Sequence, residues 1–177
     1  MATGAGEPGA ARVAGVEQRP PVTVPRTGRI VFHGQWWVAL ATPFLLLVSR
    51  PSLGAPAGWL STTGVLLLAP PLFLLLAAPV MVVALDTVAR STRSVRPSYA
   101  RASLVLWAAL AVLVVAVADP AVADSSLASS WTQGAIPPAV TTPIAWVAAL
   151  VAIAAWASAL AFAVAGYLET RRVADVD

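Results

Sequence analysis

The feature that most constrains this chain is an apolar run from residue 59 to residue 85 in which no residue is charged. An α-helix of that length reaches about 40 Å, whereas the hydrocarbon layer of a bilayer is about 30 Å thick. Helices in the core of a soluble protein do not require so long a run without a charged residue. The sequence therefore predicts that this segment crosses a membrane.

The composition agrees with a membrane protein. The chain has 177 residues, of which 59% are hydrophobic and 11% are charged, whereas soluble domains have about 45–50% apolar and about 25% charged residues. All 11 basic residues are arginine and there is no cysteine, which excludes disulfides and cysteine metal sites. Arginine without lysine, with abundant alanine and valine, favours a GC-rich genome and a bacterial inner membrane.

Apolar segments predict an all-α, multi-pass transmembrane four-helix bundle with a proline-kinked second helix. The flanking tails are expected to be cytoplasmic, and the first, rich in proline and glycine, is expected to be disordered. The predicted spans are about 30–48, 60–88, 102–118 and 143–168, between tails at 1–29 and 169–177. A competing interpretation makes residues 36–57 a cleaved signal, because the apolar centre is short and Ala55-Pro56-Ala57 resembles a cleavage site.

Three prolines interrupt the second span: Pro70, Pro71 and Pro79. Each proline lacks the backbone N–H that would bind the carbonyl four residues earlier. The carbonyls of Leu66, Leu67 and Leu75 lose their helical donors in this way. Because hydrocarbon offers no water, neighbouring helices, water or Ser/Thr hydroxyls must satisfy them.

Two alternatives for the second span stay open. The true span could begin at Pro70, since proline is favoured in the first helical turn. Alternatively, the chain could turn back at Pro70 and Pro71 as a re-entrant hairpin, which the charge distribution argues against.

The distribution of arginine predicts the orientation. Clusters flank alternate ends of the spans, and only Arg50 lies on the opposite side, so the positive-inside rule places both termini in the cytoplasm. Tyr99 is expected at the inner membrane interface. The central loop is either a topology signal alone or also a patch for anionic lipid; its arginines are Arg90, Arg93, Arg96 and Arg101.

Small residues recur every three or four positions along the last span. Such a face allows close helix approach in lipid, either inside the bundle or against another copy or another membrane subunit. Its members are Ala145, Ala148, Ala152, Ala155, Ala159, Ala163 and Gly166.

Candidate chemistry is sparse, and we expect no catalytic, cofactor or metal site. Asp119 and Asp124 share an outer loop, where we expect them to be solvated. Asp119 with Pro120 indicates a helix start, and a short surface helix to about Trp131 is expected. Asp86 and Arg90 are spaced for an i,i+4 ion pair. The basic clusters do not form one face, so nucleic acid is not an expected partner.

These observations favour a non-enzymatic membrane protein that serves as a small subunit or assembly partner of a membrane complex. The alternative is an oligomeric component of a transporter or channel, because proline-broken helices often line substrate sites. A membrane enzyme is the third hypothesis, and it requires a polar cluster at one interface that the sequence does not contain.

Overall fold

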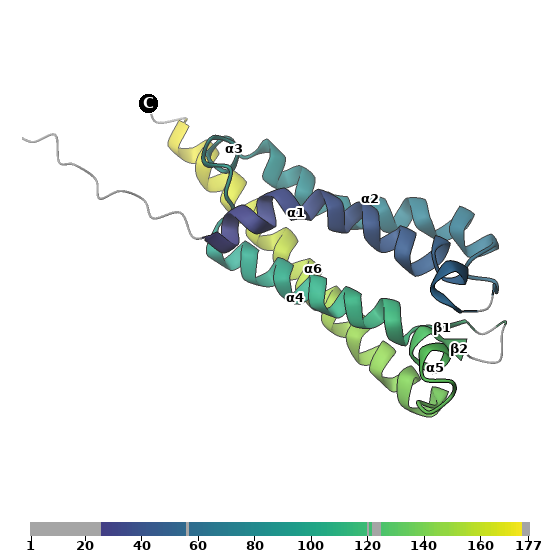
Figure 1. The fold of residues 1–177 in the computed structure, drawn as a ribbon. Coiled ribbons are helices and arrows are strands. Elements are labelled where there is room, and N and C mark those ends of the chain that lie inside the picture. Colours follow the sequence, from purple (N-terminus) through teal and green to yellow (C-terminus); the bar gives the residue numbers. More distant parts are fainter. Residues whose placement is uncertain (1–25, 56, 120, 122–124, 175–177) are drawn as a thin grey trace, which may run out of the picture.

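The computed structural model describes residues 26–55, 57–119, 121 and 125–174. Four long helices dominate the fold, which confirms the all-α prediction (Figure 1). They are α1 (Arg26–Pro43), α2 (Thr63–Leu85), α4 (Pro97–Ala116) and α6 (Pro138–Ala174). Each lies in a segment that is long and apolar enough to cross a membrane, so the chain has the architecture of an integral membrane protein.

Short elements connect the long helices. They are a π-helical turn (Phe44–Val48), a 3₁₀ turn (Pro51–Leu53), α3 (Thr87–Thr92), β1 (Ala118–Asp119), β2 (Ser125–Ser126) and α5 (Leu127–Trp131). The strands β1 and β2 pair in antiparallel fashion over two residues each. The π-helical turn follows Pro43, and the Ser49 amide donates to the Phe44 carbonyl at 3.0 Å. The regular helix therefore changes to this wider turn directly after Pro43.

Each long helix packs mainly against two of the others. The helix α1 contacts α2 and α4, and α6 contacts the same two, with the most extensive contact between α4 and α6. In Figure 1 the pair α1 and α2 and the pair α4 and α6 converge near α3 and separate toward the two strands. We call these two ends of the bundle the arginine end and the strand end.

Two clusters of buried side chains form the core. The first, near the arginine end, contains Val31, Val83, Tyr99 and Ala159 among its members. The second, midway along the bundle, is Ala39, Leu76, Leu106, Ala109, Leu110, Ala152 and Ala155. Much of the half of α2 nearest the strand end lies outside both clusters, since Leu66 and Leu67 are 79% and 61% exposed.

The first helix begins at Arg26, earlier than the predicted start at residue 30. Residues 26–29 are therefore helical, and the prediction of a disordered tail is wrong for them, whereas residues 1–25 lie outside the described residues. Packing explains the early start, because the Gly28 carbonyl accepts a hydrogen bond from the Val95 amide at 3.3 Å. A Cβ atom on Gly28 would lie only 2.4 Å from the Ser94 hydroxyl oxygen, so this close approach requires glycine.

The second helix runs without interruption through Pro70 and Pro71. The re-entrant hairpin and the late start at Pro70 are therefore wrong. The helix is shorter than the predicted residues 60–88 at both ends. Residues 59–62 form a turn, and the helix ends before Asp86, whose carboxylate accepts hydrogen bonds from the Val88 and Ala89 amides and so begins α3.

The last two long helices begin earlier than predicted because each opens with a proline. The helix α4 begins at Pro97 instead of residue 102 and ends at Ala116. The helix α6 begins at Pro138 instead of residue 143. Proline suits a first helical turn, where its missing N–H has no intrahelical acceptor.

The far end of α6 extends beyond the predicted limit at residue 168. Helical structure continues to Ala174, so residues 169–174 of the predicted C-terminal tail belong to the helix, and residues 175–177 lie outside the described residues. Arg171 and Arg172 lie in the last turn, where positive charge stabilises the negative end of the helix dipole.

Candidate functional site: the proline breaks of α2

The carbonyl freed by Pro79 receives a hydrogen bond from another helix. The Trp156 indole Nε1 of α6 donates to the Leu75 carbonyl of α2 at 2.8 Å. This bond confirms the expectation that a neighbouring helix satisfies a proline-freed carbonyl in the apolar region. An indole supplies one donor on a large apolar ring, so it reaches the carbonyl without bringing a charge into the bundle.

The two helices that share this bond run in the same direction. Trp156 lies at the level of Leu75, and further along both helices the Thr170 hydroxyl of α6 donates to the Asp86 carboxylate at 3.2 Å. Residue numbers thus rise together on α2 and α6. Positions the same number of residues before Leu75 and before Trp156 lie at similar depths in a membrane, because each residue advances about 1.5 Å.

The carbonyls freed by Pro70 and Pro71 have a different environment. Leu66 and Leu67 are strongly exposed, and both prolines are exposed as well. Among the described residues no side chain donates a hydrogen bond to either carbonyl. Because helical carbonyls point toward the C-terminus, these two face along the lipid-exposed side of α2 toward the membrane interior.

The small-residue face of α6 lies inside the bundle. Five of its seven alanine and glycine positions are buried alanines, Gly166 is also buried, and Ala145 is partly exposed. Four of the alanines belong to the clusters that α6 shares with the other long helices, namely Ala152, Ala155, Ala159 and Ala163. In the single chain this face therefore packs against the chain's own helices.

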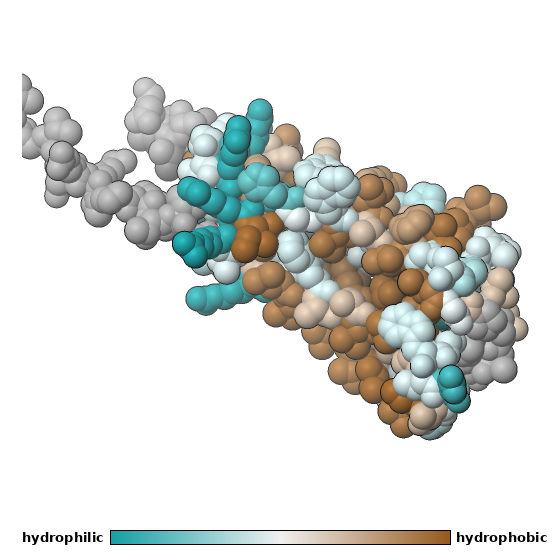
Figure 2. Space-filling model, viewed as in Figure 1, coloured by the Kyte–Doolittle hydropathy of each residue, from teal (hydrophilic) through white to brown (hydrophobic). Residues whose placement is uncertain are grey.

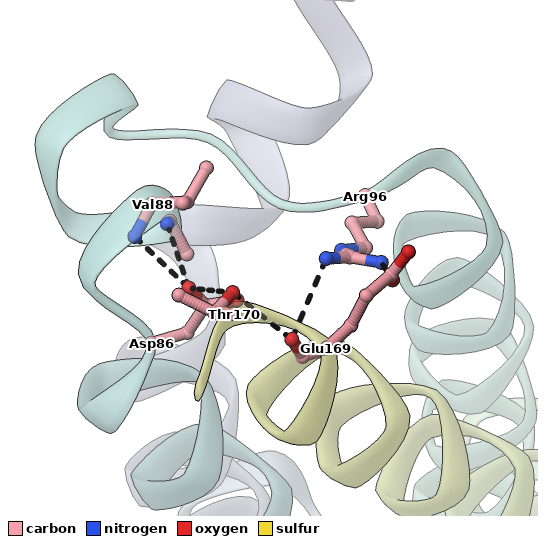
Figure 3. Close-up of polar contacts among 7 residues, drawn as sticks. Asp86, Val88, Arg96, Glu169 and Thr170 are labelled. Atoms are coloured by element: carbon pink, nitrogen blue, oxygen red, sulfur yellow. Dashed lines mark hydrogen bonds and ion pairs between the residues drawn. The ribbon is translucent and has the colours of Figure 1, made fainter. Parts of the chain in front are cut away.

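The predicted arginine patch lies at the arginine end, and its members differ in their contacts. Arg96 pairs with Glu169 of α6 and also donates to the Gly166 carbonyl at 3.4 Å (Figure 3). Hydrophilic side chains gather at this end in Figure 2, while apolar side chains cover the flanks. Eight described arginines are exposed here: Arg26, Arg29, Arg90, Arg93, Arg96, Arg101, Arg171 and Arg172.

Asp86 has a structural role that differs from the predicted ion pair with Arg90. Its Oδ1 atom accepts hydrogen bonds from the Val88 amide at 2.9 Å and from the Thr170 hydroxyl at 3.2 Å (Figure 3). The carboxylate thus caps α3 and joins it to the end of α6. Arg90 is exposed and, within the described part of the chain, it is not among the ion pairs.

Tyr99 is buried in the bundle, and its level at the inner membrane interface stays a prediction. Its hydroxyl donates to the Gln35 side-chain oxygen of α1 at 3.0 Å, and both residues are almost fully buried. The sequence analysis did not identify this pair because its members lie 64 residues apart on separate helices. Packing of α1 against α4 brings them together and satisfies two polar groups inside the bundle.

At the strand end, Arg50 and Asp119 form a buried polar centre, so the prediction of a solvated Asp119 is wrong. Each residue is 1% exposed. Asp119 accepts from the Leu60 amide at 2.9 Å and Arg50 donates to the Val117 carbonyl at 3.2 Å. Burial lowers the pKa of Arg50 from its ordinary value, and the charge of Asp119 opposes this change.

The strand end also corrects the predicted start of the surface helix. Asp119 belongs to β1, and α5 begins only after Ser126, whose hydroxyl accepts from the Ser129 amide at 3.1 Å as a helix cap. The predicted end at Trp131 is confirmed. Asp124 lies outside the described residues. One feature of the sequence could have indicated this centre. Arg50 is the one arginine predicted on the outer side, and Asp119 lies in the other loop predicted on that side.

Within the described residues no group of three His, Cys, Asp or Glu side chains could hold a metal ion. The cavity beside Gln35 and Tyr99 has a volume of about 20 Å³, and one at the arginine end beside Asp86 has about 40 Å³. A space of about 10–15 Å³ accommodates one water molecule, so these cavities suit water and not a larger ligand.

No protein-family model matches this chain, and no curated protein and no solved structure matches it. The functional argument therefore depends on the physical chemistry of the chain itself.

Proposed function

We propose that this chain is a non-catalytic assembly subunit of a membrane complex and that it binds a second copy of itself through α2. The contact surface is the exposed half of α2 that contains Pro70 and Pro71. The observation that carries the proposal is the pair of carbonyls, on Leu66 and Leu67, that lack helical donors on an exposed surface. An unsatisfied backbone group in lipid costs several kcal/mol, so a partner that supplies a donor is favoured there.

Trp146 of the second copy is the donor we expect. It lies on α6 ten residues before Trp156, so at about 1.5 Å per residue it is about 15 Å nearer the strand end. Leu66 lies about 14 Å before Leu75 on the parallel helix α2 by the same measure. Trp146 is 69% exposed, and no described residue accepts a hydrogen bond from its indole. A copy with the same membrane orientation can therefore present it at the right depth.

The internal cavities support a role through contacts more than a role in transport. The cavity beside the buried Gln35 and Tyr99 pair has about 20 Å³, which leaves room for about one water molecule. A substrate path through a single chain would require a larger polar space at this level. The transport alternative therefore has less support than assembly.

We also infer that the arginine end faces the cytoplasm of a bacterial cell and that the strand end faces outward. Eight exposed arginines lie at the first end, and positive charge is retained on the cytoplasmic side. A single thiol tests this inference because the native chain has no cysteine. In intact cells an impermeant thiol reagent should label Ser52→Cys and not Ser91→Cys; the reverse pattern would overturn the orientation.

Energy transfer between copies tests the proposed contact. Full-length chains with Ser91→Cys, which is exposed on α3, receive donor or acceptor dyes and are reconstituted together in phosphatidylcholine vesicles. Transfer should persist when lipid dilution removes random proximity. The double substitution Pro70→Ala and Pro71→Ala should weaken association about threefold, because the restored amides bind the carbonyls within the helix and one interhelical bond contributes about 0.6 kcal/mol.

The matched control is Pro79→Ala, which makes the same chemical change in the same helix at a carbonyl that already has a donor. Association of this variant should equal that of the native chain. The proposal fails if transfer falls to the random level upon dilution. It also fails if the double substitution and the control behave alike.

A further inference from the structure

A groove runs along the surface where α4 and α6 lie side by side, and all of its described lining residues come from these two helices. It consists of two adjoining hollows of about 510 Å³ and about 530 Å³ that share Val105 and Val151. Because neither α1 nor α2 contributes to it, the groove opens to the lipid surrounding the bundle. It lies apart from the α2 surface proposed for assembly.

The groove exists because small side chains form its floor and larger ones form its walls. Ala109 and Ala155 are buried between the two helices, while Val112 and Val147 stand exposed beside them. The hollow nearer the strand end is lined almost entirely by apolar atoms. A hydrocarbon chain is the ligand that such a lining suits, since it leaves no polar group without a partner.

Polar side chains line the groove only near the arginine end, as far as the described residues show. Ser98, Arg101 and Ser158 line the hollow nearer that end. The Ser158 hydroxyl binds the Ala154 carbonyl of its own helix at 2.8 Å. Arg101 is exposed and makes no hydrogen bond or ion pair within the described part of the chain, in contrast to Arg96, which pairs with Glu169.

The length of the groove fits a phospholipid. From Ser98 to Val112 the groove follows α4 for about 21 Å, at about 1.5 Å per residue. The hydrocarbon of one leaflet is about 15 Å deep, half of the bilayer core. The groove can therefore hold an acyl chain along its apolar part and a phosphate beside Arg101, because guanidinium groups bind phosphate oxygens in bidentate fashion.

We propose that this groove is a binding site for one anionic phospholipid from the leaflet at the arginine end. The phosphate pairs with Arg101, and one acyl chain lies between Val105 and Val151. An anionic headgroup is favoured over a zwitterionic one because it places a net negative charge beside the Arg101 guanidinium, whereas a zwitterionic headgroup also brings a positively charged amine there. The bound lipid fills the groove between α4 and α6.

Native mass spectrometry of the full-length chain in mild detergent tests this site, with phosphatidylglycerol and phosphatidylcholine of identical acyl chains as probes. The native chain should retain phosphatidylglycerol about fivefold more strongly, which corresponds to about 1 kcal/mol per arginine near the surface. Arg101→Gln should abolish this preference. Arg93→Gln is the matched control, because Arg93 is exposed and does not line the groove.

A second pair of variants tests whether the acyl chain binds in the apolar part of the groove. Ala108→Phe fills the groove and should reduce retention of both lipids, whereas Ala111→Phe, on an exposed position of α4 that does not line the groove, should not. Equal losses in Arg101→Gln and Arg93→Gln would overturn the proposal, as would equal behaviour of the two phenylalanine variants. Displacement by excess inorganic phosphate would instead indicate a phosphate site without a chain seat and would also overturn it.

Discussion

The helix α2 contains two proline breaks whose surroundings differ. At Pro79 the freed carbonyl of Leu75 is matched by an indole donor from α6. At Pro70 and Pro71 the freed carbonyls lie on an exposed stretch, and no described side chain donates to them. A carbonyl freed by proline therefore has a donor within the chain in one half of the helix and lacks one in the other half, among the described residues.

This difference follows from the divergence of the helix pairs. Near the second core cluster, α6 lies against α2, so Trp156 can reach across. Toward the strand end the two helix pairs separate (Figure 1), and the side chains of α2 there are left exposed. Proline in a membrane helix thus indicates where a partner is required, and the packing decides whether that partner lies within the chain.

The largest effect is expected from removing the hydrogen bond between the Trp156 indole and the Leu75 carbonyl. Trp156→Phe retains the ring and deletes the donor, leaving the Leu75 carbonyl without its partner. The free energy of unfolding should fall by about 1–3 kcal/mol, the cost of an unsatisfied polar group, as measured by reversible denaturation in mixed micelles. Combining it with Pro79→Ala, which returns a backbone N–H to that carbonyl, should restore most of the loss. Without such recovery, the indole stabilises the chain through packing and not through this hydrogen bond.

A smaller effect is expected for the matching tryptophan of the same helix. Trp146→Phe makes the same change at an indole that no described residue accepts from, so the free energy of unfolding should stay within about 0.5 kcal/mol of the native value. Association between copies should weaken about threefold, the equivalent of one interhelical bond of about 0.6 kcal/mol. Energy transfer and denaturation on the same samples measure both quantities. A loss of stability without a loss of association would remove the distinction between the two tryptophans.

The smallest effect is expected for Pro79→Ala alone. The new amide offers the Leu75 carbonyl a second donor, and a carbonyl oxygen has two lone pairs. Because the carbonyl is already satisfied, the variant should gain only a few tenths of a kcal/mol beyond the change in helix propensity, and the gain should be smaller than that of the Pro70→Ala and Pro71→Ala pair. Parallel denaturation curves for these variants make the comparison. A larger gain at Pro79 would mean that the bond from Trp156 is weak.

Local patterns in the sequence were sufficient to predict the four spans and the need for a donor at each proline. The length of each apolar segment predicts the spans, and the amide that proline lacks predicts the need for another donor. Trp156 could not be identified in the same way, because its register against Leu75 depends on how α2 and α6 pack. The same limit applies to the Gln35 and Tyr99 pair, whose members lie on separate helices.

The polar ends were harder to predict than the spans. Asp86 appeared to be an i,i+4 partner of Arg90. A carboxylate at a helix start instead accepts from backbone amides, and these amides and the Thr170 hydroxyl all donate to its Oδ1 atom. Arg50 and Asp119 appeared to be separate loop residues. Their common burial depends on two loops that meet only after the helices have packed.

The bond between Trp156 and Leu75 spans 81 positions of the chain, which has a consequence for biosynthesis. During membrane insertion α2 enters the bilayer long before the last helix has been translated. Throughout that interval the Leu75 carbonyl has no indole to bind, and Asp86 and Arg96 also lack their partners on α6. A nascent product that stops short of the final helix therefore exposes several polar groups that the finished protein satisfies within its own bundle.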